Sequence, residues 1–348
     1  MTSQPFAKAA PHAPPKRAGE LLRTAREHDR AGRLDHALAD YDAAIQLSEK
    51  SGERTILIES LRRLGVLHHR RNSRDVAAEL CRRSHSTADG AGDRREAGEA
   101  LNVLGRFDLE AGEMQAAARH FERALALAGK QDDLRGRIEQ NLGVMATMLG
   151  DREAAQAHFT RALQALEASE SHLDCGLTWH DLGRLALAAG DIEPAVSHLA
   201  RSADIAKSLG DIHLEGLCHL SQAELLHGQA QLAAAKTSVL RALEIFELLD
   251  IPLDRSAAHR VLGMVYRDTG KHREAAHQFR RAVQLAEETR WMLGEANALV
   301  EMARLNLLME SRDEATAHLT TAHGLYSHMN ARLETADVSR QLMDLATG

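Results

Sequence analysis

The sequence predicts an all-α fold built by repetition, and three observations lead to this prediction. Hydrophobic residues make up 44% of the 348 residues but aromatic residues only 3%, and an aliphatic core of this kind suits packed helices better than sheets. Four of the six prolines lie before residue 16, so few helix breakers remain in the body of the chain. The third observation is an internal repeat with a period of about 40 residues.

Residues 1–16 are expected to form a flexible, proline-rich tail, with Pro5, Pro11, Pro14 and Pro15. They lack the apolar run of a signal peptide, and no later segment reaches the roughly 18 uninterrupted apolar residues of a membrane span. The three cysteines are widely spaced and form no CxxC pair, which favours neither a disulfide framework nor a zinc knuckle. We therefore expect a cytoplasmic protein without membrane contact.

Each repeat is defined by four positions. A small residue, usually preceded by leucine, recurs at an interval that is constant except for one slightly shorter step: Ala25, Gly65, Gly105, Gly143, Gly183, Ala223, Gly263 and Ala303. An alanine follows twelve positions later: Ala37, Ala77, Ala117, Ala155, Ala195, Ala235, Ala275 and Ala315. Four positions further stands a larger apolar residue: Tyr41, Cys81, Phe121, Phe159, Leu199, Val239, Phe279 and Leu319. Three positions after it comes a second small residue: Ala44, Ser84, Ala124, Ala162, Ser202, Ala242, Ala282 and Ala322.

This pattern predicts a pair of packed helices in each of the eight units. Small residues let two helix backbones approach closely, and a bulky residue fills the gap beside them. The turn between the two helices is marked by residues that tolerate positive φ: Gly32, Asn72, Gly112, Gly150, Gly190 and Gly270. Because one hairpin cannot bury its apolar face alone, we expect a solenoid over residues 17–330, closed by a capping helix at 331–348.

With these positions identified, the chain resembles the tetratricopeptide repeat family, whose units carry Leu-Gly in the first helix and Ala, Phe or Tyr, and Ala in the second. Trp179 and Tyr266 match the aromatic positions before and after the Leu-Gly pair. The resemblance implies a right-handed superhelical solenoid of eight hairpins. The long period is similar to that of the longer-helix arrays in maltose-activator-type bacterial regulators and in animal spindle-orientation adaptors.

Motifs for catalysis are absent from the sequence, which contains no GxSxG elbow, no Walker-type phosphate loop and no HExxH. The net charge of −7 gives no general electrostatic reason to bind nucleic acid. No two of the 20 histidines are three or four positions apart, the spacing by which one helix binds a metal ion. We therefore predict a non-enzymatic protein with no cofactor, no metal site and no direct contact with nucleic acid.

Four histidines occupy the same position of the repeat, directly before the bulky residue of the second helix: His120, His158, His198 and His318. At about 100° per residue, this position lies at the edge of the packed stripe. A half-buried boundary residue is the favoured interpretation. A pH-sensitive ladder of imidazoles is the alternative, because stacked repeats bring equivalent positions to about 10 Å from one another.

The resemblance implies that a partner binds along the concave face, which first-helix residues line. The implied positions lie three before, two before and one after the small residue. The candidates for this peptide-binding groove are Arg62, Arg63, Asn102, Arg106, Gln140, Asn141, His180, Arg184, Arg260 and Arg304. Arginine binds carboxylates through two parallel bonds, and amide side chains can both donate to and accept from a peptide backbone. The predicted ligand is therefore a peptide segment with acidic residues.

The leading hypothesis is an adaptor or scaffold that holds such a segment of a protein partner, as a monomer or a weak dimer. The alternative is a regulatory module that senses a ligand or peptide, changes its superhelical pitch and acts on a separate output protein. No DNA-binding or catalytic output domain is recognisable in the sequence.

Overall fold

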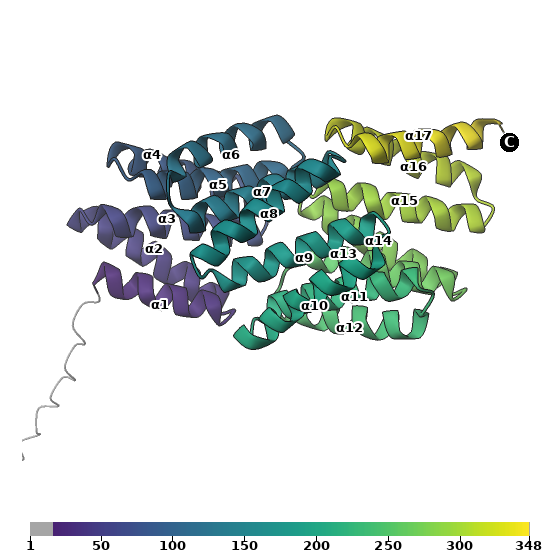
Figure 1. Ribbon diagram of the computed structural model, residues 1–348, viewed down its shortest axis with the longest axis horizontal. Coiled ribbons are helices and arrows are strands. Elements are labelled where there is room, and N and C mark those ends of the chain that lie inside the picture. The colour runs from purple at the N-terminus through teal and green to yellow at the C-terminus, as the bar shows by residue number, and fades with distance from the viewer. Residues whose placement is uncertain (1–16, 348) are drawn as a thin grey trace, which may run out of the picture.

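The computed structural model describes residues 17–347, so the tail predicted at 1–16 lies outside the described residues. Within this range the chain forms seventeen helices and no strand. The predicted all-α fold is therefore confirmed. Figure 1 shows the helices as antiparallel pairs that stack side by side along a superhelical path.

Sixteen of the helices in the described range form eight hairpins, which we number as units 1 to 8. The first helices of the units are α1 (Ala18–Arg30), α3 (Arg54–Arg70), α5 (Arg94–Glu110), α7 (Asp132–Met148), α9 (His172–Ala188), α11 (Ile212–Gly228), α13 (Pro252–Asp268) and α15 (Met292–Leu308). The second helices are α2 (Leu34–Ser51), α4 (Arg74–Gly90), α6 (Met114–Ala128), α8 (Arg152–Ala168), α10 (Ile192–Leu209), α12 (Leu232–Leu248), α14 (His272–Glu288) and α16 (Arg312–His328). A last helix, α17 (Arg332–Thr347), follows unit 8 and buries Val338 against it.

The small residue of each first helix lies where the two helices of its hairpin cross. A Cβ atom placed on Gly105 would stand 2.6 Å from the ring of Phe121, and one placed on Gly143 would stand 2.6 Å from the ring of Phe159. Both phenylalanines are fully buried. The repeat positions therefore make the close helix contact that the sequence pattern predicts.

A second close contact, which the sequence analysis did not identify, lies seven residues earlier in several first helices. A Cβ atom on Gly216 would stand 2.7 Å from the ring of Phe246. At the same level Ser202 donates a hydrogen bond to the carbonyl of Gly176 at 2.8 Å, and Ser84 donates to the carbonyl of Ile58 at 2.8 Å. Each serine that replaces alanine in the repeat is thus a buried donor with a partner, and it joins the two helices of its hairpin.

The turn inside each hairpin contains one residue in the left-handed region. All six predicted turn residues adopt it, with φ between 61° at Asn72 and 79° at Gly190. In units 6 and 8 the same place is taken by Ala230 and Glu310, with φ of 57° and 60°. Neither residue has the conformational freedom of glycine, so composition alone could not have identified these two turns.

The superhelix also contacts itself, because the turns of units 2 to 4 reach the last two units and α17 (Figure 1). These contacts join Asn72 to Glu288, Gly112 to Met292 and Met329, and Gly150 to Leu333. We call this line of contacts the seam. Its centre is apolar, since one cluster of buried side chains includes both Met114, beside the turn at Gly112, and Met329 near the end of the chain.

Close packing at the crossing predicts the effect of Gly143→Ala. The added methyl group overlaps the ring of Phe159, so we expect a loss of about 1–3 kcal/mol in the free energy of unfolding, although alanine alone would favour the helix by about 1 kcal/mol. Adding Phe159→Val copies the pair of unit 6, Ala223 and Val239, and relieves the overlap. Urea denaturation should therefore show the double variant to be less destabilised than the sum of the two single variants; additive losses would mean that the two residues do not share this contact.

Candidate functional site: the inner groove

The ten predicted groove residues lie on first helices, and the structure brings seven of them into two cavities. A cavity of about 490 Å³, which we call the groove cavity, is lined by Arg62, Arg63, Asn102, Arg106 and Asn141. A cavity of about 240 Å³ near the end of the chain is lined by Arg260 and Arg304. Gln140, His180 and Arg184 line neither of these two cavities.

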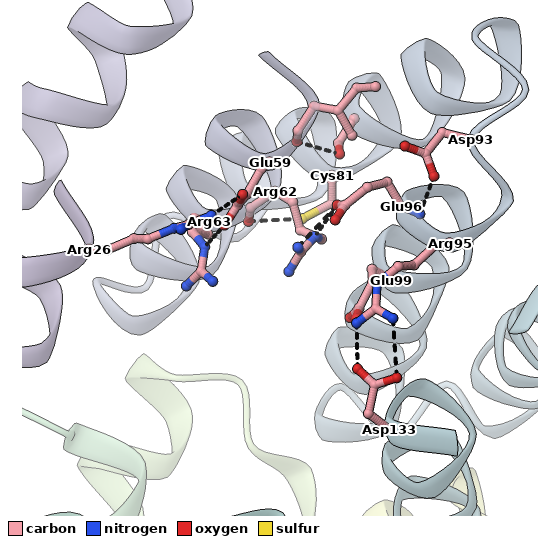
Figure 2. Close-up of polar contacts among 12 residues, drawn as sticks. Arg26, Glu59, Arg62, Arg63, Cys81, Asp93, Arg95, Glu96, Glu99 and Asp133 are labelled. Atoms are coloured by element: carbon pink, nitrogen blue, oxygen red, sulfur yellow. Dashed lines mark hydrogen bonds and ion pairs between the residues drawn. The ribbon is translucent and has the colours of Figure 1, made fainter. Parts of the chain in front are cut away.

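Carboxylates from neighbouring first helices face the arginines of the groove cavity (Figure 2). Glu59 lies between Arg26 of α1 and Arg63 of its own helix, with 2.5 Å from its Oε1 to Nε of Arg63. Arg62 reaches Glu96 of α5 at 3.1 Å. Arg62 and Arg63, which the sequence assigned to an acidic ligand, are therefore already paired within the protein.

The same arrangement continues into unit 4. Arg95 of α5 binds Asp133 of α7 through both terminal nitrogens, one of them at 3.2 Å (Figure 2). Arg137 of α7 contacts Glu99 of α5 and reaches Asp174 of α9 at 3.5 Å. These pairs form a ladder in which the first helix of one unit binds the first helix of the next.

Amide and imidazole groups extend this ladder through the middle of the array. Asn141 donates from Nδ2 to Oδ1 of Asn102 at 2.9 Å, and Gln140 donates from Nε2 to Asp181 at 2.8 Å. His180 is only 4% exposed, and its Nε2 lies 2.9 Å from the hydroxyl of Ser221. Sequence reasoning assigned these side chains to a ligand, whereas each one also joins adjacent units.

The later units repeat the pattern with fewer residues. Arg260 pairs with Glu224 at 2.5 Å. Glu301, whose side chain is 6% exposed, is held between Arg267 and Arg304. Burial by itself raises the pKa of Glu224, but the charges of Arg260 and Arg184 hold it below its ordinary value.

Two of the predicted arginines differ from the others. Arg106 and Arg184 are exposed, and neither side chain has an ion pair or hydrogen bond with any residue in the range 17–347. The free positive charge of the groove is thus smaller than its arginine content suggests. The sequence indicates carboxylates that can pair with these arginines, since Glu59 and Glu99 occupy the same position of successive repeats, six residues before the small residue.

The four repeat histidines are half-buried, as predicted for a boundary position. Each contact that they make lies within a single hairpin: Nδ1 of His120 is 2.7 Å from Asp108, Nδ1 of His158 is 2.8 Å from Glu139, and the ring of His198 stacks on Trp179 with 5.1 Å between centroids. Burial lowers the pKa of His198 and of His318. In the described part of the chain no contact joins one of these histidines to the next, so the imidazole ladder has no structural support.

Two further properties of the described residues concern metal ions and membranes. Over residues 17–347, no group of three or more histidine, cysteine or acidic side chains is placed to hold a metal ion. None of the helices in that range combines the length and the apolar character that crossing a bilayer requires.

Fold and site together define a helical repeat scaffold, and comparison with known proteins identifies the kind of repeat. Family models of the tetratricopeptide repeat match residues 134–208 and 260–289. These matches, together with the fold, support a tetratricopeptide repeat protein. This family is in general a non-enzymatic scaffold for protein–protein interaction.

One curated relative and two solved structures illustrate the similarity. The Tonsoku-like protein of Danio rerio is 23% identical over 246 residues, which are 70% of this chain but only 14% of that protein. The Cut9–Hcn1 hetero-tetramer of the APC/C contains a chain with a TM-score of 0.60 and 14% identity, covering 90% of this chain and 55% of that chain. A Rap protein in complex with Competence and Sporulation Factor has a TM-score of 0.56 and 14% identity, covering 94% of this chain and 97% of that one. Likeness at these identities shows the fold alone.

The ladder predicts a dependence of stability on pH. Burial raises the pKa of Glu59, but hydrogen bonds from Arg26 and Arg63 hold it below its ordinary value. Since this pKa is depressed in the folded state, the stabilisation is present above the unfolded value of about 4.3 and is lost as the pH falls through the folded value. Glu59→Gln should therefore cost about 1–2 kcal/mol at pH 7 and less at pH 3.5.

Thermal denaturation at the two pH values measures this difference. Glu27→Gln is a matched control, because Glu27 pairs with Arg23 at an exposed site on α1, and it should have little effect at either pH. An equal loss for Glu59→Gln at both pH values would contradict the role of its charge.

Proposed function

We propose that this protein is a non-enzymatic adaptor that holds a peptide segment of a partner against the inner surface of its first helices. The observation that carries the proposal is the pair of exposed, unpaired arginines, Arg106 of α5 and Arg184 of α9, on a surface where the other predicted arginines are neutralised. Two acidic side chains of the partner would pair with them. Because the rest of the surface carries little free charge, these two positions set the register of the segment.

The amides between these arginines provide a site for the partner's backbone. Asn141 uses Nδ2 to bind Oδ1 of Asn102. Among residues 17–347, Nδ2 of Asn102 and Oδ1 of Asn141 have no hydrogen-bond partner, and both side chains line the groove cavity. One donor and one acceptor side by side suit the C=O and N–H of an extended peptide.

The two buried cysteines, Cys81 and Cys175, are poorly suited to act as nucleophiles. All three thiols are free. Burial raises the pKa of Cys81 to about 12 and that of Cys175 to about 11, so neither is a ready nucleophile. The two solved structures named above are a Cut9–Hcn1 hetero-tetramer and a Rap protein complexed with Competence and Sporulation Factor, and these complexes support an interaction role for this chain.

A groove variant tests the adaptor proposal. The change is Arg106→Ala, Asn141→Ala and Arg184→Ala together, with Arg119→Ala as the control, since Arg119 is likewise exposed but lies on a second helix. Affinity purification with the wild-type chain identifies bound proteins, and the binding segment of each is then made as a labelled peptide. We expect at least about a tenfold loss of affinity in the triple variant and none in the control, because each charge-assisted hydrogen bond contributes roughly 1.5–3 kcal/mol. If every captured partner binds the triple variant normally, the groove assignment fails.

The seam favours a second candidate, a regulatory module whose pitch responds to a ligand and which acts on a separate output protein. Few residues hold the turns of units 2 to 4 against the end of the chain. A contact of this small size can open and close at low cost in free energy.

Met329→Asp tests whether the seam controls the pitch. Met329 is 1% exposed and packs on the turn at Gly112, and a carboxylate there would disrupt this buried apolar contact, so we expect a larger radius of gyration by small-angle X-ray scattering with unchanged helix content. Leu248→Asp is the control, since Leu248 is 76% exposed at the end of α12. Equal radii for the two variants would argue against the regulatory candidate.

A further inference from the structure

A cavity of about 470 Å³ lies on the seam beside Asn72, outside the groove described above. One side is formed by the ends of the first helices of units 1 to 3 and their turns, including Val66, His69 and Arg74. The other side is formed by the loops that precede units 6, 7 and 8, including Ile251 and Pro252. A ligand in this cavity would touch both ends of the array at once.

Most carboxylates in this cavity have a hydrogen-bond partner within residues 17–347, although only Asp29 is paired with an arginine. Among the described residues that line it, four carry carboxylates. Three are engaged: Asp29 with Arg70 at 2.9 Å, Asp211 with the N–H of Leu214 at 2.8 Å, and Asp254 with His213 at 2.8 Å. The fourth is Glu110, whose Oε2 lies 3.3 Å from Nε2 of His69. Burial, together with Arg74 and Arg106, lowers the pKa of His69 to about 3, so Glu110 faces a neutral imidazole.

Two positive charges in the same cavity remain unused. Arg74 and Arg106 both line it, and in the described part of the chain neither side chain has an ion pair or hydrogen bond. Nε of Arg74 is buried without a partner. Burial and the charge of Arg290 lower the pKa of Arg74, although Glu110 opposes them. A guanidinium in this state is incompletely compensated, and an added anion would stabilise it.

We propose that this cavity binds a small phosphate monoester, with its phosphate between Arg74 and Arg106 and its apolar body against Val66, Ile251 and Pro252. Arg74 and Arg106 line the cavity without an ion pair to any described residue, Arg290 acts on Arg74 from nearby, and Glu110 is the carboxylate whose charge acts on both Arg74 and Arg106. A phosphate monoester carries close to two negative charges at neutral pH, and arginine binds its oxygens in a bidentate manner.

This site is independent of the peptide groove in all but one residue. Arg106 lines both cavities, whereas Arg74 and Glu110 line only the seam cavity, and Asn141 lines only the groove cavity. Arg74 variants therefore report on the phosphate site, and the double variant Asn141→Ala and Arg184→Ala reports on the groove. A phosphate monoester bound at Arg106 also competes there with an acidic side chain of a peptide.

Isothermal titration of phenyl phosphate into the full chain at pH 7.5 and low salt tests the proposal, with inorganic phosphate as the reference. We expect phenyl phosphate to bind at least about tenfold more tightly than inorganic phosphate, because its ring covers the apolar wall. Arg74→Ala should weaken the binding of phenyl phosphate by about tenfold or more. Arg119→Ala and the Asn141→Ala, Arg184→Ala variant should leave its affinity unchanged.

Glu110→Gln gives a gain of binding that does not depend on a damaged fold. It removes the carboxylate whose charge acts on both arginines, with little change in shape, so phenyl phosphate should bind several-fold more tightly than to the wild type. Equal binding by the wild type and a folded Arg74→Ala variant overturns the proposal, and so does equal affinity for phenyl phosphate and inorganic phosphate. If Arg74→Ala does not fold, Glu110→Gln decides, since no gain in affinity also overturns it.

Discussion

The close approach of two helices inside each hairpin is the constraint on which the rest of this structure depends. At Gly105 and Gly143 a single missing methyl group admits the ring of a buried phenylalanine, and the hydroxyl of Ser202 joins the same pair of helices in its own unit at a second level. Two crossing points fix the angle of one hairpin. Because the units share these positions, the fixed angle is passed from unit to unit and determines the pitch of the whole array.

Ion pairs between first helices impose a second constraint on the inner surface. Arg62 with Glu96, and Arg95 with Asp133, each join one unit to the next. Such pairs orient neighbouring hairpins, and they also remove positive charge from the surface that a partner would meet. A groove rich in arginine is thus close to neutral along much of its length, and the few arginines left unpaired become the distinctive positions.

The features that depend on local spacing could be predicted from the sequence. The eight hairpins and the six turns marked by glycine or asparagine follow from residues within one unit, and the structure has them where the pattern places them. The turns at Ala230 and Glu310 could not be predicted, because ordinary residues adopt the positive φ that the turn between two antiparallel helices requires. The pairing of Glu59 with Arg26 and Arg63 was missed for another reason, since the three-position groove rule did not include the position of that carboxylate. The contact of Asn72 with Glu288 could not be predicted from the sequence, because it depends on the rotation between successive units, summed over five units.

The seam changes how this array should be regarded as a folding unit. In an open solenoid each repeat touches only its neighbours, terminal repeats fray first, and repeats can be gained or lost with little penalty. Here the seam gives units 2 to 4 a second set of neighbours far along the chain, and Asn72 and Glu288 are 216 positions apart. Contacts of such long sequence separation form late in folding, because the units between them must be ordered first. They also restrict the number of repeats, because one inserted unit would shift every seam contact out of register.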